Sequence, residues 1–125
     1  MIRNGIDITE IARIRRSAEN PRFLEKIYGA HERAELAARG FAPQHLAGAF
    51  AAKEAFSKAL GTGIRGFSLC EVEILHDDFG APYFLLSGAA KQLAESKNLE
   101  FSLSITHTDT LAAAMVTAYE RGAER

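Results

Sequence analysis

The stretch from Pro43 to Leu60 constrains the fold more than any other part of the sequence. It reads PQHLAGAFAAKEAFSKAL, and its proline suits the first turn of a helix, where no N–H is needed. Three glycines in the next segment, GTGIRG, stop the helix and predict a loop. We therefore predict one long, largely apolar helix that is followed by a glycine-rich loop.

The predicted helix has two faces of different character, because residues three, four or seven positions apart lie on one side. The face suited to a core consists of Ala52, Ala55, Phe56 and Ala59. The other face consists of Phe50, Glu54, Ser57, Lys58 and Gly61. From spacing alone, Glu54 and Lys58 are predicted to form a surface ion pair worth about 0.3–0.5 kcal/mol, on a helix with no special function.

Shorter elements are predicted on both sides of this helix. Alternating or apolar segments predict strands at residues 1–8, 72–74, 83–86, 101–105 and 111–119. Further helices are expected after an N-cap at Thr9, at 23–28, at 32–39, and at 88–96 after a Ser87 cap. The short turn HTDT predicts an antiparallel hairpin of the last two strands. The expected fold is a single α+β domain over residues 1–125, with an antiparallel sheet packed against the long helix.

The charge and cysteine content restrict partners and compartment. A net charge of −1 gives no general case for nucleic-acid binding. Five basic residues near the N-terminus either steer an acidic partner or form a solvated helix face: Arg13, Arg15, Arg16, Arg22 and Lys26. The single cysteine, Cys70, fits a reducing compartment and is expected to be a buried apolar residue. No signal-like or membrane-spanning segment appears, so we expect a cytoplasmic protein.

Two acidic residues are candidates for a metal site. Asp7 ends the first predicted strand, and Glu54 lies on the polar side of the long helix. Two carboxylates from separate elements suit Mg²⁺, which completes its shell with water and substrate phosphate. On spacing alone, Asp7 is slightly better explained as the N-cap of the first helix than as a metal ligand. His107 fits a turn, and the histidines lack zinc-ligand spacing.

Four segments taken together resemble a known family. In chain order they are GIDITEIARI, FAAKEAFSKALGTG, GAPYFLLSG and SITHTDTLAAAMV. They are similar to the holo-[acyl-carrier-protein] synthases, the short class of 4′-phosphopantetheinyl transferases, over nearly the whole chain. The resemblance implies transfer of the phosphopantetheine group of coenzyme A to a serine of apo-acyl carrier protein, which releases adenosine 3′,5′-bisphosphate. It also implies a trimer with the coenzyme in the cleft between subunits.

The resemblance also implies roles for individual residues. Asp7 and Glu54 would bind Mg²⁺ and act in catalysis with Lys58, and which of the two carboxylates orients the base stays open. The residues implied to contact coenzyme A are Phe50, Ser57, Lys58, Gly61, Gly63, Pro82, Thr106, His107 and Thr108. The residues implied to face the acidic carrier protein are Arg13, Arg22 and Lys26.

Two positions depart from the family pattern. Ala49 stands where the family usually has arginine, and Ala81 where it often has lysine, both near the expected nucleotide site. Arg65 is one basic residue that would compensate for them. The departures leave open an alternative function, a non-catalytic module that binds coenzyme A or a carrier protein. The resemblance does not name the carrier, which would serve fatty-acid, polyketide or another synthesis.

Overall fold

The computed structural model describes residues 1–122, so the last three residues of the predicted domain lie outside the described part. The helices are α1 Ile11–Ser17, α2 Pro21–Ile27, α3 Ala30–Ala38, α4 Pro43–Leu60 and α5 Gly88–Ser96, with a short 3-10 helix η1 at Leu69–Glu71. The strands are β1 Ile2–Glu10, β2 Val72–His76, β3 Pro82–Leu86, β4 Leu99–His107 and β5 Leu111–Glu120. The long helix therefore has the bounds predicted from its proline and glycines.

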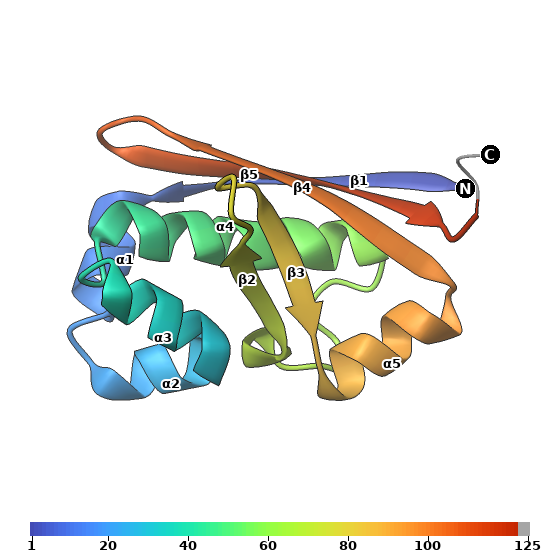
Figure 1. The fold of residues 1–125 in the computed structure, drawn as a ribbon, viewed down its shortest axis with the longest axis horizontal. Coiled ribbons are helices and arrows are strands. Elements are labelled where there is room, and N and C mark those ends of the chain that lie inside the picture. The colour runs from blue at the N-terminus through green and yellow to red at the C-terminus, as the bar shows by residue number, and fades with distance from the viewer. Residues whose placement is uncertain (123–125) are drawn as a thin grey trace.

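The strands form two antiparallel sheets. The larger sheet has the order β1-β5-β4, and the smaller one pairs β2 with β3. The hairpin predicted from the HTDT turn is confirmed, because β4 and β5 pair along their whole length. In Figure 1 the larger sheet lies across α4, with α1, α2 and α3 at one end of the molecule and α5 at the other. The α+β prediction is confirmed, with the addition of a second, two-stranded sheet.

Helix α4 packs directly against β1 through small residues. A Cβ atom at Gly5 would collide with the backbone of Ala55 and Ala59, so only glycine allows this close approach. The face predicted for the core is confirmed, because its three alanines and Phe56 are fully buried. Phe56 contacts the rings of Phe67, Phe84 and Phe101, with centroid distances of 4.6–5.8 Å. Aromatic contacts thus join the helix to both sheets.

Four local predictions are wrong or only partly right. Thr9 does not cap α1, because β1 continues through it to Glu10 and its hydroxyl instead donates to Asp7 Oδ2 at 2.8 Å. Asp7 likewise lies within β1 and is not an N-cap. Ser87 stands at the N-cap of α5, but its side chain makes no capping hydrogen bond. Cys70 is half-buried rather than buried, because it lies in the 3-10 helix η1 at the edge of the core.

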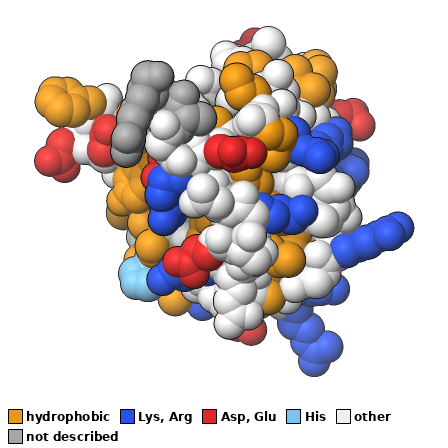
Figure 2. Space-filling view, turned by 90° about the vertical axis from the view of Figure 1, so that its right-hand side faces the viewer, with side chains coloured by type: hydrophobic (Ala, Val, Ile, Leu, Met, Phe, Trp, Pro, Cys, Tyr) orange, Lys and Arg blue, Asp and Glu red, His pale blue; other side chains and the backbone are white. Residues whose placement is uncertain are grey.

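The outer face of the larger sheet carries exposed apolar side chains along β1 and β5. The large hydrophobic side chains exposed on it are Ile2, Ile6, Ile8, Leu111 and Met115. A view of the end that carries both termini also shows hydrophobic side chains at the surface between charged ones (Figure 2). An exposed apolar patch on one sheet face is typical of a protein–protein contact.

Candidate functional site

Asp7 lies near the middle of β1, on the side that faces α4. Its Oδ2 accepts the hydrogen bond from Thr9, and its Oδ1 lies 3.4 Å from Lys58 Nζ. The side chain is only 19% exposed, whereas that of Lys58 is 54% exposed. One carboxylate oxygen is therefore oriented by its own strand and the other by the helix.

Glu54 lies close to Asp7 but has no ion pair or side-chain hydrogen bond within residues 1–122. Burial, and then the nearby charge of Asp7, raise the pKa of the Glu54 carboxyl, while Lys58 and Arg13 lower it. Two neighbouring carboxylates repel each other when their negative charges are not fully balanced by nearby cations. Such a pair favours binding of a proton or a metal cation.

Lys58 does not pair with Glu54, so the predicted surface ion pair is wrong. The Lys58 ammonium instead reaches across to β1 and donates to the carbonyl oxygen of Ile6 at 2.8 Å as well as to Asp7. The prediction failed because of tertiary packing. Strand β1 brings two acceptors within reach of the ammonium, and a single i,i+4 ion pair is too weak to compete with them. The lysine remains exposed enough to meet a ligand.

The residues present fit a magnesium ion that is shared with a substrate. No group of three or more His, Cys, Asp or Glu residues in the described chain could hold a metal by itself. Mg²⁺ commonly takes one or two protein carboxylates and leaves the remaining positions to water and substrate phosphates. The unpaired Glu54 beside Asp7 has the chemistry of such a partial site.

A second candidate region lies on the opposite flank of α4. His107 ends β4 and lines a pocket together with His45 and Ala49 of α4 and His76 of β2. Nine residues separate His45 from Glu54, and at about 100° per residue they point to opposite sides of the helix. Asp7 and His107 also lie on the two different edge strands of the larger sheet. One chain therefore presents two half-sites and does not bring them together.

The other residues expected near the coenzyme have varied surroundings. Thr106 is exposed on β4, Thr108 Oγ1 accepts the backbone N–H groups of Thr110 and Leu111, and Pro82 begins β3. Ser57 is 2% exposed and donates to the backbone carbonyl of Glu54. Its place on the polar face is therefore wrong, and its contact with coenzyme A stays a prediction.

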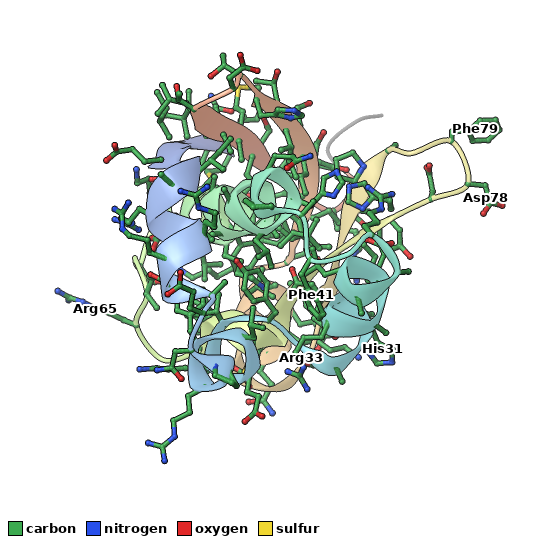
Figure 3. The ribbon with its side chains drawn as sticks, turned by 90° about the vertical axis from the view of Figure 1, so that its left-hand side faces the viewer. His31, Arg33, Phe41, Arg65, Asp78 and Phe79 are labelled. Carbon is green, nitrogen blue, oxygen red and sulfur yellow. The ribbon has the colours of Figure 1, made fainter. Side chains whose placement is uncertain are left out.

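The glycine loop is shaped by left-handed backbone. Gly61 has φ 89° and ends α4, and Gly63 has φ 65°. A Cβ at Gly61 would lie 2.5 Å from Nη1 of Arg3, so glycine also gives room to this guanidinium. Sequence analysis missed Arg3, which adds a cation at the end of the helix that carries Glu54 and Lys58. Arg65, considered as a compensating cation, projects from the same loop away from the body (Figure 3).

Phe50 belongs to an aromatic and basic surface. Its ring stacks on Phe23 with centroids 6.5 Å apart, and the Arg13 guanidinium lies 5.5 Å above it. Arg22 and Lys26 come from α2, whose Asn20 side chain caps the backbone N–H of Arg22 at 3.0 Å. The basic residues predicted to meet a partner are thus divided between α1 and α2, beside an aromatic pair.

A family model, the 4′-phosphopantetheinyl transferase superfamily, matches residues 3–116. The chain belongs to this superfamily. A holo-[acyl-carrier-protein] synthase of Caldanaerobacter subterraneus is 46% identical over 116 residues, which cover 91% of each chain. The family resemblance seen in the sequence motifs is confirmed.

Solved structures of family members have the same fold. The holo-[acyl-carrier-protein] synthase of Neisseria meningitidis superposes with a TM-score of 0.89 at 36% identity, covering 96% of this chain and 100% of that one. The Helicobacter pylori enzyme, solved in complex with coenzyme A, gives a TM-score of 0.80 at 34% identity, covering 95% and 100%. The fold prediction is confirmed at the level of the family.

Sequence analysis of this family member missed the pocket of the second candidate region and a buried ion pair. His45, Arg39 and His76 line the pocket but belong to none of the recognised motifs. Lys53, inside the FAAKEAF motif, is fully buried and donates to Glu32 at 2.7 Å. Lys53 belongs to neither of the two helix faces defined from spacing. This was the only indication in the sequence that its surroundings differ from those of a surface lysine.

Proposed function

We propose that this chain is a holo-[acyl-carrier-protein] synthase that moves the 4′-phosphopantetheine group of coenzyme A to a serine of apo-acyl carrier protein. The observation that carries this proposal is Glu54, a carboxylate without a partner, beside Asp7 and Lys58. A reaction between two polyanions needs such a site, where a cation and a lysine meet a pyrophosphate. The single domain would span residues 1–125.

The reaction joins the serine oxygen to the β-phosphorus of coenzyme A. The bond from that phosphorus to the oxygen bridging the two phosphates breaks, and adenosine 3′,5′-bisphosphate leaves. The serine hydroxyl is a weak nucleophile, so a base must take its proton. Asp7 or Glu54 would orient this base, since both carboxylates lie beside Lys58.

Asp7 and Glu54 would hold Mg²⁺, and this ion would supply neutralisation of the pyrophosphate and polarisation of the phosphoryl group. Lys58 is positioned to donate to the oxygen of the departing phosphate, because its contacts with Ile6 and Asp7 hold the ammonium beside the carboxylates. Thr9 fixes the rotamer of Asp7 through its hydroxyl. These contacts orient the reacting groups before substrate arrives.

A trimer would complete the site. The nucleotide half of coenzyme A would bind on the His107 flank of α4, and the pyrophosphate on the Glu54 flank. Because the two flanks of one chain face opposite directions, we infer that one coenzyme bridges two copies. The exposed apolar side chains around Ile6 and Met115 support such an assembly, since burying them would stabilise the contact.

The acyl carrier protein would dock on the basic surface of α1 and α2. Arg13, Arg22 and Lys26 would meet its acidic helix, and the exposed part of the Phe50–Phe23 pair would give an apolar contact. Among residues 1–122 no helix is long and apolar enough to cross a membrane. A cytoplasmic location stays our expectation from the cysteine content.

Intact-mass spectrometry tests the proposed function. Purified protein with Mg²⁺, coenzyme A and an apo-acyl carrier protein is expected to yield a carrier heavier by one phosphopantetheine. Coenzyme binding in calorimetry, without any mass shift on a range of carriers, would instead favour the non-catalytic module that Ala49 and Ala81 suggest.

The shared site has its own test. The variants Glu54→Gln and His107→Ala are each expected to have low transferase activity when assayed alone. Mixing them after mild dissociation should restore part of the activity, because some interfaces then pair an intact Glu54 with an intact His107. Activity that never exceeds the sum of the two variants would contradict a site built from two copies.

A further inference from the structure

The pocket on the His107 flank of α4 combines apolar walls with an arginine and three histidines. It lies between α3, α4, β2 and β4, and its polar lining consists of Glu35, Arg39, Gln44, His45, His76 and His107. Its volume is about 60 Å³. A water molecule needs about 10–15 Å³ by the same measure, so a group the size of phosphate has room.

The one acidic residue of the lining, Glu35, already has hydrogen-bonding partners for both carboxylate oxygens. Glu35 Oε1 accepts the backbone N–H of His76 at 3.0 Å, and Oε2 lies 2.8 Å from His76 Nδ1. Arg39, the C-cap residue of α3, makes no ion pair within residues 1–122. Arg39 is therefore a cation of the pocket lining that is free to attract an anion.

His45 contributes an atom that has no hydrogen-bonding partner among residues 1–122. Its Nδ1 is the buried side-chain nitrogen or oxygen of the described residues that lacks a hydrogen bond. Buried polar atoms are nearly always paired, so such an atom points to a missing ligand or water. Burial, and then the charge of Arg39, lower the pKa of His45, with His76 and His107 adding to the effect and Glu35 opposing it. These surroundings therefore favour the neutral imidazole over the imidazolium.

We propose that His45 is a further coenzyme-binding residue of this chain, which takes up a proton when the phosphate monoester of the nucleotide half enters the pocket. The inference rests on the proposed function, which supplies coenzyme A as the ligand. The proton comes from solvent, adds to the neutral imidazole, and no covalent bond of the ligand changes. Both ring nitrogens of the imidazolium then donate, so Nδ1 gains an acceptor.

The physical reason is the charge of the ligand. A phosphate dianion beside an imidazole stabilises its protonated form and reverses the effect of burial and Arg39. Ala49 also lines the pocket, where the family usually has an arginine that stays charged at every working pH. In this chain a titratable group replaces that permanent charge. Affinity for the nucleotide therefore falls as the pH rises.

Calorimetric titration of adenosine 3′,5′-bisphosphate and of coenzyme A between pH 6.5 and 8.5 tests this. Below that range the phosphate monoester itself gains a proton. One linked proton weakens binding by up to about tenfold per pH unit. Titrations in two buffers with different ionisation enthalpies should reveal the proton uptake. Dephospho-coenzyme A, which lacks the monoester, should show a much flatter pH dependence.

Substitutions test whether His45 is the residue that takes up the proton on ligand binding. His45→Asn keeps a hydrogen-bonding group near the Nδ1 position without titrating, so it should bind with a flatter pH dependence. His31→Asn is the matched control, because His31 lies on the outside of α3 with its side chain 72% exposed and pairs with Glu73 (Figure 3). It should keep the slope of the unaltered protein.

Two results overturn the inference alone: an unchanged slope in His45→Asn, or an equal slope for dephospho-coenzyme A, while coenzyme A still binds and reacts. Absence of coenzyme A binding at every pH would overturn the proposed function as well. Melting temperatures measured at each pH show whether His45→Asn is folded, and a folded His45→Gln provides the same comparison if it is not.

Discussion

Lys53 and Glu54 follow one another in α4 but face different surroundings. Lys53 is fully buried, and its ammonium donates to Glu32 Oε1 at 2.7 Å and to the carbonyl oxygens of Val72 and Leu69 at 2.6 and 3.2 Å. Three donors thus meet three acceptors. Glu54 lies beside a second carboxylate and has no partner within residues 1–122.

The difference separates charges that hold the fold from charges that await a ligand. Glu32 also accepts the backbone N–H groups of Gly29 and Ile74, so the buried pair joins α3, α4 and β2. Burial disfavours both charged forms, and it raises the pKa of Glu32 and lowers that of Lys53. The ion pair is tolerated because its hydrogen bonds are complete. At Glu54 they are incomplete, and a cation or a reacting hydroxyl can complete them.

The largest effect is expected from Lys53→Met. The change leaves Glu32 buried without its cation, and such a loss costs about 3–5 kcal/mol of unfolding free energy. Chemical denaturation should show the loss. The double variant Lys53→Met with Glu32→Gln should recover part of it, because the amide oxygen still accepts a backbone N–H without a buried charge. A single variant as stable as the original chain would contradict the assigned role of this pair.

The bounds of α4 could be predicted from the sequence because both signals are local. Pro43 fits the first turn, and Gly61 supplies the left-handed residue that ends the helix. The burial of Lys53 could not be predicted, because its acceptors come from α3, η1 and β2, far away in the sequence. A lysine in an alanine-rich helix has the same local pattern whether or not such acceptors cover it.

The candidate site was predictable only through its motifs. Spacing paired Glu54 with Lys58, and that was wrong because β1 offers Lys58 the carbonyl of Ile6 and the carboxylate of Asp7. The motifs selected Asp7, Glu54 and Lys58, and the structure brings them together. His45, Arg39 and His76 of the second pocket belong to no motif, and only the packing of α3 and β2 against α4 brings them together.

The second largest effect is expected from Glu54→Gln, on activity rather than stability. The amide keeps the shape of the side chain but removes the charge that would help to hold Mg²⁺. We expect turnover to fall by about 100-fold or more, close to 3 kcal/mol of transition-state stabilisation. Steady-state kinetics at saturating coenzyme A measures the loss.

A matched control keeps this comparison specific. Glu19→Gln removes an exposed carboxylate just after α1, outside the site, and should leave turnover unchanged. The melting temperature of Glu54→Gln should not fall, because the variant also removes repulsion from Asp7. Full turnover in Glu54→Gln would show that this carboxylate is not needed for the reaction. Glu54 would then no longer stand as a functional charge in contrast to Lys53.

The smallest effect is expected in the pH dependence of stability, and it follows from the sign of the Glu54 shift. Because the pKa of Glu54 is raised in the folded chain, the folded state holds the proton more tightly than the unfolded state. Its stabilising contribution is complete below the ordinary glutamate pKa of about 4.3 and is lost as the pH rises through the folded value. Without Mg²⁺, Glu54→Gln should therefore be more stable than the original chain at neutral pH, and this advantage should shrink as the pH falls toward 4. Denaturation curves of both chains, recorded with and without Mg²⁺, measure the difference.

Magnesium that stabilises the original chain but not the variant would complete the contrast with Lys53, whose partners are all supplied by the protein. An equal response of both chains to the ion would instead place the metal away from Glu54.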